Sequence, residues 1–369
     1  MAVRFAGRIA TAQKAMALSG LDILVVTNRE NLIYFTGVSQ IECMALLIPK
    51  EGEACAIALW LDADYVREHS GLTTHAYFFP RQTIGPAICQ YARSFGYTGP
   101  RIGFERYFVD FAVYDALRAA FSERNFIGAG DLFYRLRSVK EPEELDMLRR
   151  ASAAVCEGMD AAMKAVRPGA AELDVLAEAE YAMLRAGSGG SSFRPQVVSG
   201  ERTLLAHPAA SSKRIREGEV VVVHLGATCE GYCAKMARTA AVGVIPKGQA
   251  DVHALLLSAL ERAEAALRPG ATSGEVDAAA RDVIEQAGFG KSYLESVGYG
   301  VGLRQSEFYP VIGRGRPEII ETDMVIDLLL PTIYRKGIGG PRITDVIRVG
   351  VSENELFTNY PRDLVNILI

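Results

Sequence analysis

Short apolar runs alternate with amphipathic stretches along the first third of the chain. Apolar residues recur at helical spacing through residues 5–19. Short apolar runs bounded by Gly, Pro and polar residues predict extended segments. These segments are 22–27, 31–37, 44–48 and 54–59, the last two joined as a hairpin by 49–52. Helical and strand-like stretches alternate again over 86–95, 101–104 and 111–121. This alternation predicts a small α/β domain with a central sheet.

A domain boundary is predicted near Arg137. Ser138 is a candidate capping residue, and Pro142 and the acidic residues after it suit the first turn of a helix. The helix should run to about Val166. Because single cores rarely grow beyond about 250–300 residues, a chain of 369 residues should form two domains. We assign them to residues 1–137 and 138–369.

The second domain contains an internal repeat. The sequence Ala-Val-Arg-Pro-Gly-Ala at 165–170 recurs as Ala-Leu-Arg-Pro-Gly-Ala at 266–271. In each copy a helix ends at Pro-Gly, an amphipathic helix follows, and two strands come later. The predicted strands are 219–224 and 236–242 in the first copy, and 323–328 and 342–349 in the second. Two related halves that share one core predict a pseudo-twofold α/β domain with a pocket where the halves meet.

Two polar residues stand out beside the most apolar strand. Val220 to Val223 is a β-branched run of the kind buried on both faces of a sheet. We place His224 at the end of this strand and Lys235 at the start of the next, with the intervening residues forming the turn. A lysine here either extends its ammonium to solvent along an apolar stem or serves in a site.

The composition of the chain indicates which partners to expect and in which cell compartment. Hydrophobic residues make up 49% of the chain, the net charge is −4, and no basic run occurs, so nucleic acid and anionic membranes are not expected partners. No apolar run reaches the ~20 residues that span a bilayer, and the N-terminus lacks the apolar core of a signal peptide. The six cysteines form no CxxC pair, which is typical of reduced thiols in the cytoplasm.

The second domain resembles the pita-bread fold of the creatinase, methionine aminopeptidase and prolidase superfamily (peptidase family M24). The resemblance rests on eight motifs: Phe193–Gly200, His207-Pro208, Gly218–Gly226, Gly231-Tyr232, Arg238-Thr239, Gly298–Leu303, 330–334 and Gly340–Asp345. Through residues 31–37 the first domain resembles the N-terminal domain of creatinase and Xaa-Pro peptidases. The resemblance implies a smaller creatinase-type α/β domain followed by a pita-bread domain, and a homodimer.

Metal-dependent members of this superfamily hold two divalent ions with two Asp, one His and two Glu. The corresponding positions here are His224, Lys235, Tyr299, Leu330 and Thr344. Hard divalent cations prefer carboxylate oxygen, and this set has lost all four carboxylates and gained an ammonium. The resemblance therefore predicts no metal site, and we expect no cofactor.

Creatinase is the member of the superfamily that hydrolyses a C–N bond without metal, and it serves as the template for our functional prediction. We predict a metal-independent, creatinase-like hydrolase or lyase of a small C–N-containing substrate. His207 matches the creatinase histidine and is the predicted acid/base. Lys235 would stabilise an oxyanion or bind a carboxylate, and Glu307 would be a base. The predicted substrate-binding residues are His224, Tyr299, Arg304, Glu42 and Arg342.

Several alternatives stay open. His207 is also compatible with a structural role, Lys235 with a buried ion pair to Asp327 or Asp345, and Arg342 with bracing of the two half-sheets. Creatinase has carboxylates where this chain has Ala237 and Leu330. A non-catalytic protein that binds a peptide or small molecule is therefore the second prediction, and a metal-dependent Xaa-Pro aminopeptidase or dipeptidase the third. The basic residues favour an anionic ligand, whereas Glu42 and Glu307 favour a cationic one.

Overall fold

The computed structural model describes residues 2–41, 43–329 and 332–368. The chain divides into two compact units, Met1–Arg137 and Ser138–Ile369. None of the described helices is both long enough and apolar enough to cross a bilayer. The α/β class predicted for both domains is confirmed.

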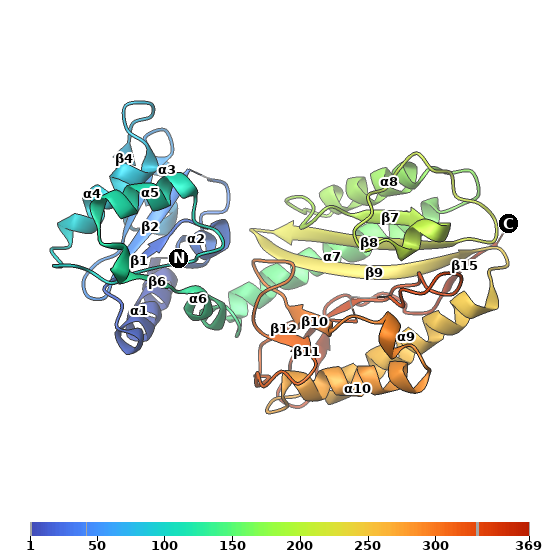
Figure 1. The fold of residues 1–369 in the computed structure, drawn as a ribbon. Coiled ribbons are helices and arrows are strands. Elements are labelled where there is room, and N and C mark those ends of the chain that lie inside the picture. The colour runs from blue at the N-terminus through green and yellow to red at the C-terminus, as the bar shows by residue number, and fades with distance from the viewer. Residues whose placement is uncertain (1, 42, 330–331, 369) are drawn as a thin grey trace. The chain divides into compact units, whose positions relative to one another are not determined.

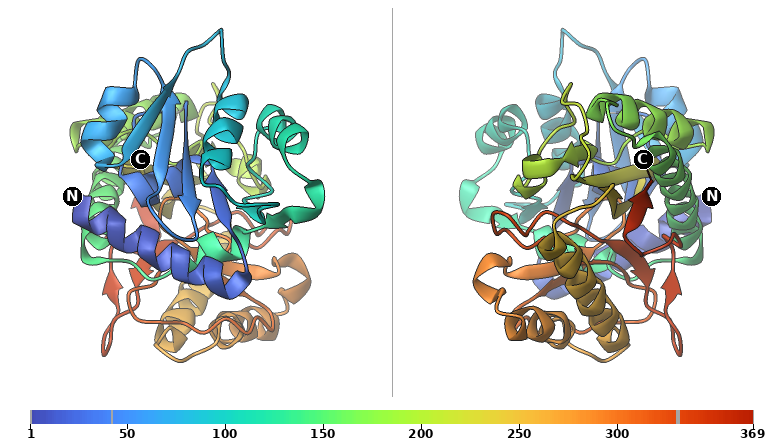
Figure 2. Two further views of the ribbon diagram at one scale, coloured as in Figure 1. Left: turned by 90° about the vertical axis from the view of Figure 1, so that its left-hand side faces the viewer. Right: turned by 90° about the vertical axis from the view of Figure 1, so that its right-hand side faces the viewer.

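The first unit is built on one six-stranded sheet, with strand order β4-β3-β2-β1-β5-β6. Its strands are β1 Ile23–Val26, β2 Met44–Pro49, β3 Cys55–Leu59, β4 Thr73–Tyr77, β5 Ile102–Phe104 and β6 Phe126–Gly128. Its helices are α1 Ala2–Ser19, α2 Arg29–Thr36, α3 Ala63–Ser70, α4 Ile84–Ser94, α5 Phe111–Ala120 and α6 Gly130–Leu136, with a 3₁₀ turn at Glu123–Asn125. Alternate residues of β1 and β2 contribute to the apolar core on the side of α4 and α5 (Figure 2, left). The predicted hairpin is confirmed as β2 and β3, which pair antiparallel.

One predicted extended segment is wrong. Residues 31–37 belong to helix α2, which ends where Gly37 adopts a left-handed φ of 69° and donates its N–H to the Ile33 carbonyl. All residues from Asn31 to Thr36 are buried. Because every residue from 31 to 36 is buried, this part of the helix shows no exposed stripe, and a short run of this kind cannot be told from a strand by its periodicity.

The second unit contains two half-sheets. One has the order β15-β9-β8-β7 and the other β11-β10-β12-β13-β14 (Figure 1). The strands are β7 Gln196–Ser199, β8 Val220–Cys229, β9 Tyr232–Val242, β10 Ser296–Gly300, β11 Val311–Gly313, β12 Val325–Leu328, β13 Asp345–Arg348, β14 Glu355–Leu356 and β15 Val365–Ile367. The helices are α7 Pro142–Ala165, α8 Glu172–Arg185, α9 Lys247–Ala266 and α10 Ser273–Gln286, with 3₁₀ turns at Gly200–Leu204 and Gly290–Ser292. A backbone bridge between Ala237 and Thr344 connects the two half-sheets.

The internal repeat of the sequence is also a repeat of structure. Helices α8 and α10 are each 14 residues long and occupy equivalent positions in the two copies. The residue before each helix makes the same kind of antiparallel bridge, Ala171 to Arg214 and Thr272 to Ile319. Each half also has its own apolar core, one formed with α7 and α8 and the other with α9 and α10.

The β8–β9 hairpin is longer than predicted. Its strands continue to Cys229 and resume at Tyr232, so that His224 and Lys235 lie inside strands and not at their ends. His224 is opposite Ala237, and Gly226 is opposite Lys235. Because side chains alternate along a strand, these four residues share one face. The other face, including Leu225 and Met236, packs into the core of the first half. Glycine inside the strand was mistaken for a turn signal.

Candidate functional site

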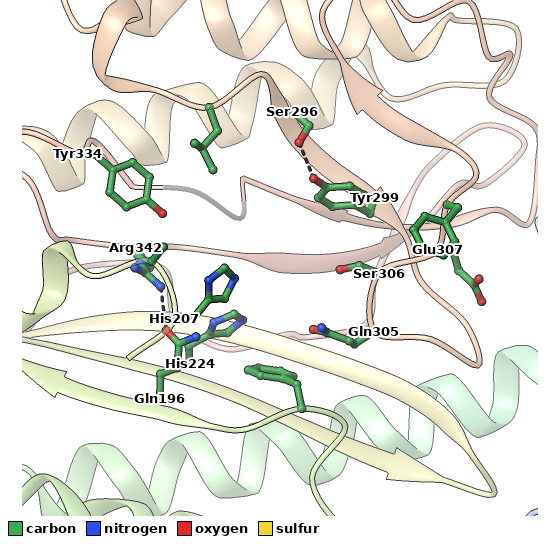
Figure 3. A pocket seen from close by; sticks show the side chains of 14 residues that line it. Gln196, His207, His224, Ser296, Tyr299, Gln305, Ser306, Glu307, Tyr334 and Arg342 are labelled. Atoms are coloured by element: carbon green, nitrogen blue, oxygen red, sulfur yellow. Dashed lines mark hydrogen bonds between the residues drawn. The ribbon is translucent and has the colours of Figure 1, made fainter. Parts of the chain in front are cut away.

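A cavity of 370 Å³ lies in the second unit and is lined by residues of both half-sheets (Figure 3). Strands β7 and β8 contribute Gln196 and His224, and β10 contributes Tyr299. Loop residues add His207, Ser306 and Arg342. The volume is near the lower end of the range for small-ligand sites.

His224 is held in the pocket wall without a hydrogen bond. Its side chain is on the face of β8 that points away from the apolar core, and its ring is 4.6 Å from the Phe193 ring, centroid to centroid. The residue is 6% exposed, and neither ring nitrogen has a partner among the described residues. Burial lowers the pKa of His224 well below its ordinary value, and the positive charges of Arg342 and Lys235 lower it further. The imidazole is therefore neutral near pH 7.

Arg342 is a buried cation with only neutral partners. It is 3% exposed. Its guanidinium donates to Gln196 Oε1 at 2.9 Å and to the Leu205 carbonyl at 2.6 Å. Its Nε has no acceptor, and no carboxylate of the described residues pairs with it. Burial lowers the pKa of Arg342, although Arg is charged throughout the physiological range.

Lys235 is in a fully buried ion pair with Asp327, one of the two partners suggested by the sequence. The Nζ–Oδ2 distance is 2.9 Å, and both side chains are 0% exposed. Lys235 Nζ also donates to Ser306 Oγ at 2.8 Å, and the Tyr299 N–H donates to Asp327 Oδ1 at 2.9 Å. Burial raises the pKa of Asp327, an effect that Lys235 and the Tyr299 N–H oppose. Lys235 does not line the cavity, so its link to the pocket runs through Ser306.

The other predicted site residues divide into two groups. His207 is exposed and lines the pocket. Tyr299 also lines the pocket, and its hydroxyl forms a hydrogen bond of 2.6 Å with Ser296 Oγ. Glu307 also lines the pocket, but its carboxylate accepts the Arg304 N–H at 3.3 Å and points away from His207, His224 and Arg342 (Figure 3).

Two predicted binding residues do not join this group. Arg304 does not line the cavity, and its guanidinium is 5.0 Å from the centroid of the Phe308 ring. Glu42 lies outside the described residues.

Sequence reasoning missed three residues that build the site. Gln196 is opposite His224 in the β7–β8 ladder and holds Arg342. Tyr334 lines the pocket. Glu172 anchors residues 199–211, which carry His207, through several hydrogen bonds. Gln196 and Tyr334 lie in motifs that the sequence analysis identified, but neither residue was selected there as a candidate site residue.

The described residues do not fit two metal ions. Of the five superfamily ligand positions, His224 offers a ring nitrogen, whereas Lys235 offers a positive charge that already binds Asp327. The Thr344 hydroxyl donates to the Leu329 carbonyl, and Leu330 lies outside the described residues. Over the described ranges, no group of three or more His, Cys, Asp or Glu side chains is placed to hold an ion.

Replacement of His224 by Phe should raise stability, more so at acid pH. Phe fills the site and removes two buried polar atoms without partners, which gains about 1 kcal/mol of unfolding free energy at neutral pH. Below about pH 6.5 the unfolded histidine binds a proton that the buried, neutral ring does not, so wild type loses stability as pH falls. The difference in unfolding free energy between His224→Phe and wild type should therefore increase by up to about 1.4 kcal/mol for each pH unit below this value.

Urea unfolding of both proteins at about pH 7.5 and about pH 5.5, with EDTA present, measures this difference. His69→Phe, at an exposed ring, is the control and should show no such widening. A constant difference across this range would mean that the His224 ring takes up a proton in the folded state as readily as in the unfolded chain.

Comparison with known proteins identifies relatives over almost the whole chain. Residues 146–350 match the model of metallopeptidase family M24, and residues 8–139 match that of the creatinase/prolidase N-terminal domain. An Xaa-Pro dipeptidase of Pyrococcus furiosus is 27% identical over 97% of this chain and 99% of its own. A probable dipeptidase, PepE, of Mycobacterium bovis is 30% identical over 98% and 96%. The solved structure of an Xaa-Pro dipeptidase from Bacillus anthracis aligns with a TM-score of 0.90 at 28% identity, covering 98% of this chain and 100% of that one.

These findings correct the predicted function. Several full-length relatives are named Xaa-Pro dipeptidase or probable dipeptidase, and the matching family is described as a metallopeptidase. The prediction of a metal-independent, creatinase-like hydrolase is therefore wrong. The superfamily and the fold were predicted correctly, and the enzyme class is that of a hydrolase. The chain belongs to metallopeptidase family M24.

Proposed function

We propose that this protein hydrolyses short peptides, with dipeptides of the Xaa-Pro type as the substrate class. The observation that carries the proposal is the similarity to Xaa-Pro dipeptidases along both units, including the segments that line the pocket. The cavity has the size of a small-ligand site and a wall of mixed polar and apolar residues, which suits a dipeptide.

Two pocket residues match the needs of amide hydrolysis. Water adds to the carbonyl carbon, the C–N bond breaks, and the departing amine takes up a proton. His207 is exposed on the pocket wall, where an imidazole can give that proton to the amine. The Tyr299 hydroxyl, on the opposite half-sheet, can donate a hydrogen bond to the developing oxyanion. Because the described residues do not fit two metal ions, no step is assigned to a metal.

Proline release from Ala-Pro and Leu-Pro by the purified full chain tests this proposal. We expect release from these dipeptides and much slower cleavage of Pro-Ala, which lacks the Xaa-Pro bond. His207→Gln should lower kcat by about 100-fold or more, the scale of a lost general acid. Assays with EDTA, and with Mn²⁺, Co²⁺ or Zn²⁺ added back, measure metal dependence directly. Absence of proline release under every metal condition would overturn the proposal.

Two further predictions belong with this function. The homodimer expected from the resemblance stays a prediction, which light scattering of the purified chain would test. The cytoplasmic location inferred from the cysteine pattern also stays a prediction.

A further inference from the structure

The backbone around His207 belongs to no helix or strand and follows the 3₁₀ turn Gly200–Leu204. Within the described part of the chain, no hydrogen bond between backbone groups involves residues 206–210. The hydrogen bonds to Glu172 are made at the ends of the longer stretch 199–211. The middle of this stretch therefore keeps a fixed position only if side chains hold its backbone.

Three arginine side chains hold it. Each guanidinium donates to one backbone carbonyl, and the carbonyls belong to alternate residues: Leu205 accepts from Arg342 at 2.6 Å, His207 from Arg194 at 2.7 Å, and Ala209 from Arg202 at 2.5 Å. Hydrogen bonds from a charged donor are stronger than those between neutral groups. Since Arg194 and Arg342 come from outside the stretch, these contacts connect it to other parts of the pocket wall.

Arg194 differs from the other two arginines in what it contacts. Arg342 and Arg202 each have further partners in the fold. Among the described residues, Arg194 has one hydrogen-bond partner, the His207 carbonyl, and its side chain is exposed. An exposed arginine that pairs with no carboxylate contributes little to global stability. Its contact therefore bears on the local position of His207.

The residues on both sides of Arg194 belong to the pocket. Phe193 lines the cavity and contacts the His224 ring, and Gln196 begins strand β7 and lines the cavity too. His207 lies beside His224 in this wall (Figure 3), close enough for its charge to lower the pKa of His224. The guanidinium of Arg194 thus connects a part of the wall that is fixed by a strand to the loop that carries His207.

We propose that Arg194 is a positioning residue, whose hydrogen bond to the His207 carbonyl fixes the imidazole where it can give a proton to the departing amine. This inference rests on the proposed function, which supplies the reaction. Proton transfer requires the imidazole within hydrogen-bond reach of the amine, and a misplacement of about 1 Å can cost about 100-fold in rate. Arg194 contacts no reacting atom in this assignment and acts through His207 alone.

The primary test removes the donor and keeps the apolar stem. In Arg194→Met we expect kcat for Ala-Pro to fall about 5- to 20-fold with KM within about 2-fold, because the groups that bind substrate are unchanged. Arg194→Lys keeps a charged donor and should recover most of this loss. In a His207→Gln background, Arg194→Met should lower kcat no further, since no acid is left to position. Arg185→Met, at an exposed arginine that ends α8, is the matched control and should behave as wild type does.

A second measurement does not depend on turnover. The chain has five histidines, and with ¹³C-labelled histidine the Cε1–H signal of His207 is the one that is missing in His207→Gln. In Arg194→Met this signal should sharpen and move toward that of histidine in a disordered peptide, because the freed loop averages over several positions. In Arg185→Met it should stay where it is in wild type.

The outcomes separate this inference from the proposed function. An unchanged kcat in Arg194→Met, or a loss of the same size with and without His207, overturns the inference even where Xaa-Pro peptides are cleaved. If wild type releases no proline under any metal condition, the proposed function fails and the His207 signal decides alone. A signal that moves in Arg194→Met then upholds Arg194 as the residue that fixes the imidazole, and an unmoved signal overturns it.

Discussion

Lys235→Met is expected to lower the free energy of unfolding by about 3–5 kcal/mol, the loss typical of a buried ion pair that is left with one partner. Both side chains are 0% exposed, so Asp327 would face an apolar environment with the Tyr299 N–H as its neighbouring donor. Methionine fills most of the lysine volume, and the loss therefore reports charge and hydrogen bonding more than packing. Urea unfolding followed by circular dichroism measures it.

The double variant Lys235→Met/Asp327→Leu provides the decisive control. Replacement of both charges by apolar groups removes the unpaired carboxylate, and its stability should return to within about 1 kcal/mol of wild type. Lys247→Met is the matched surface control, because the Lys247–Asp251 pair has side chains 87% and 60% exposed and should contribute almost nothing. A loss below about 1 kcal/mol in the single Lys235 variant would show that Asp327 is neutral in the fold.

The sequence predicted the fold well where local signals were repeated. The Arg-Pro-Gly motif at two positions was sufficient to identify the paired helices α8 and α10, because each copy carried the same stop and start signals. Helix α2 and the true length of the β8–β9 hairpin were missed. Helix α2 was missed because residues 31–36 are all buried and show no helical alternation of polar and apolar positions. The hairpin was predicted too short because Gly226, which lies inside β8, was interpreted as part of the turn.

The site was harder to predict, since its chemistry depends on contacts between distant segments. Four of the residues predicted from motif positions, His207, His224, Tyr299 and Arg342, line one cavity in the structure, and their roles stay predictions. Whether Lys235 pairs with Asp327 or Asp345 was left open, because it depends on which strand of the second half lies opposite β9. The direction of the Glu307 carboxylate could not be inferred from its neighbours in sequence.

The functional prediction failed for a different reason. The prediction was based on the five positions that hold metal ligands in the superfamily. Because this chain lacks the carboxylates at these positions, we chose creatinase, which acts without metal, as the template. Several relatives that match over both units are named Xaa-Pro dipeptidase. Their similarity extends over far more residues than the ligand set. A few side chains at known positions indicate only what those side chains can bind. Similarity over the whole pocket and the segments that support it is a better indication of the substrate class.

Glu172 is such a supporting residue, although it lies outside the pocket. It begins helix α8, is 0% exposed, and accepts hydrogen bonds from the backbone N–H groups of Ser199 and Ser211 and from both serine hydroxyls, at 2.7–3.1 Å. Arg202 Nε adds a charged donor at 3.1 Å. One carboxylate at a helix N-terminus thus ties down both ends of the segment that carries His207.

We expect Glu172→Gln to lower the free energy of unfolding by about 2–3 kcal/mol, because an amide nitrogen replaces one acceptor and turns a donor toward buried N–H and hydroxyl groups. Residues 199–211 should then loosen, which limited proteolysis detects as faster cleavage within this segment, and kcat for dipeptides should fall because His207 loses its fixed position. Glu178→Gln makes the same change at an exposed position of α8 and should alter none of these measurements. If Glu172→Gln lost stability while cleavage of residues 199–211 and kcat stayed at wild-type values, the carboxylate would stabilise the helix alone and would not position His207.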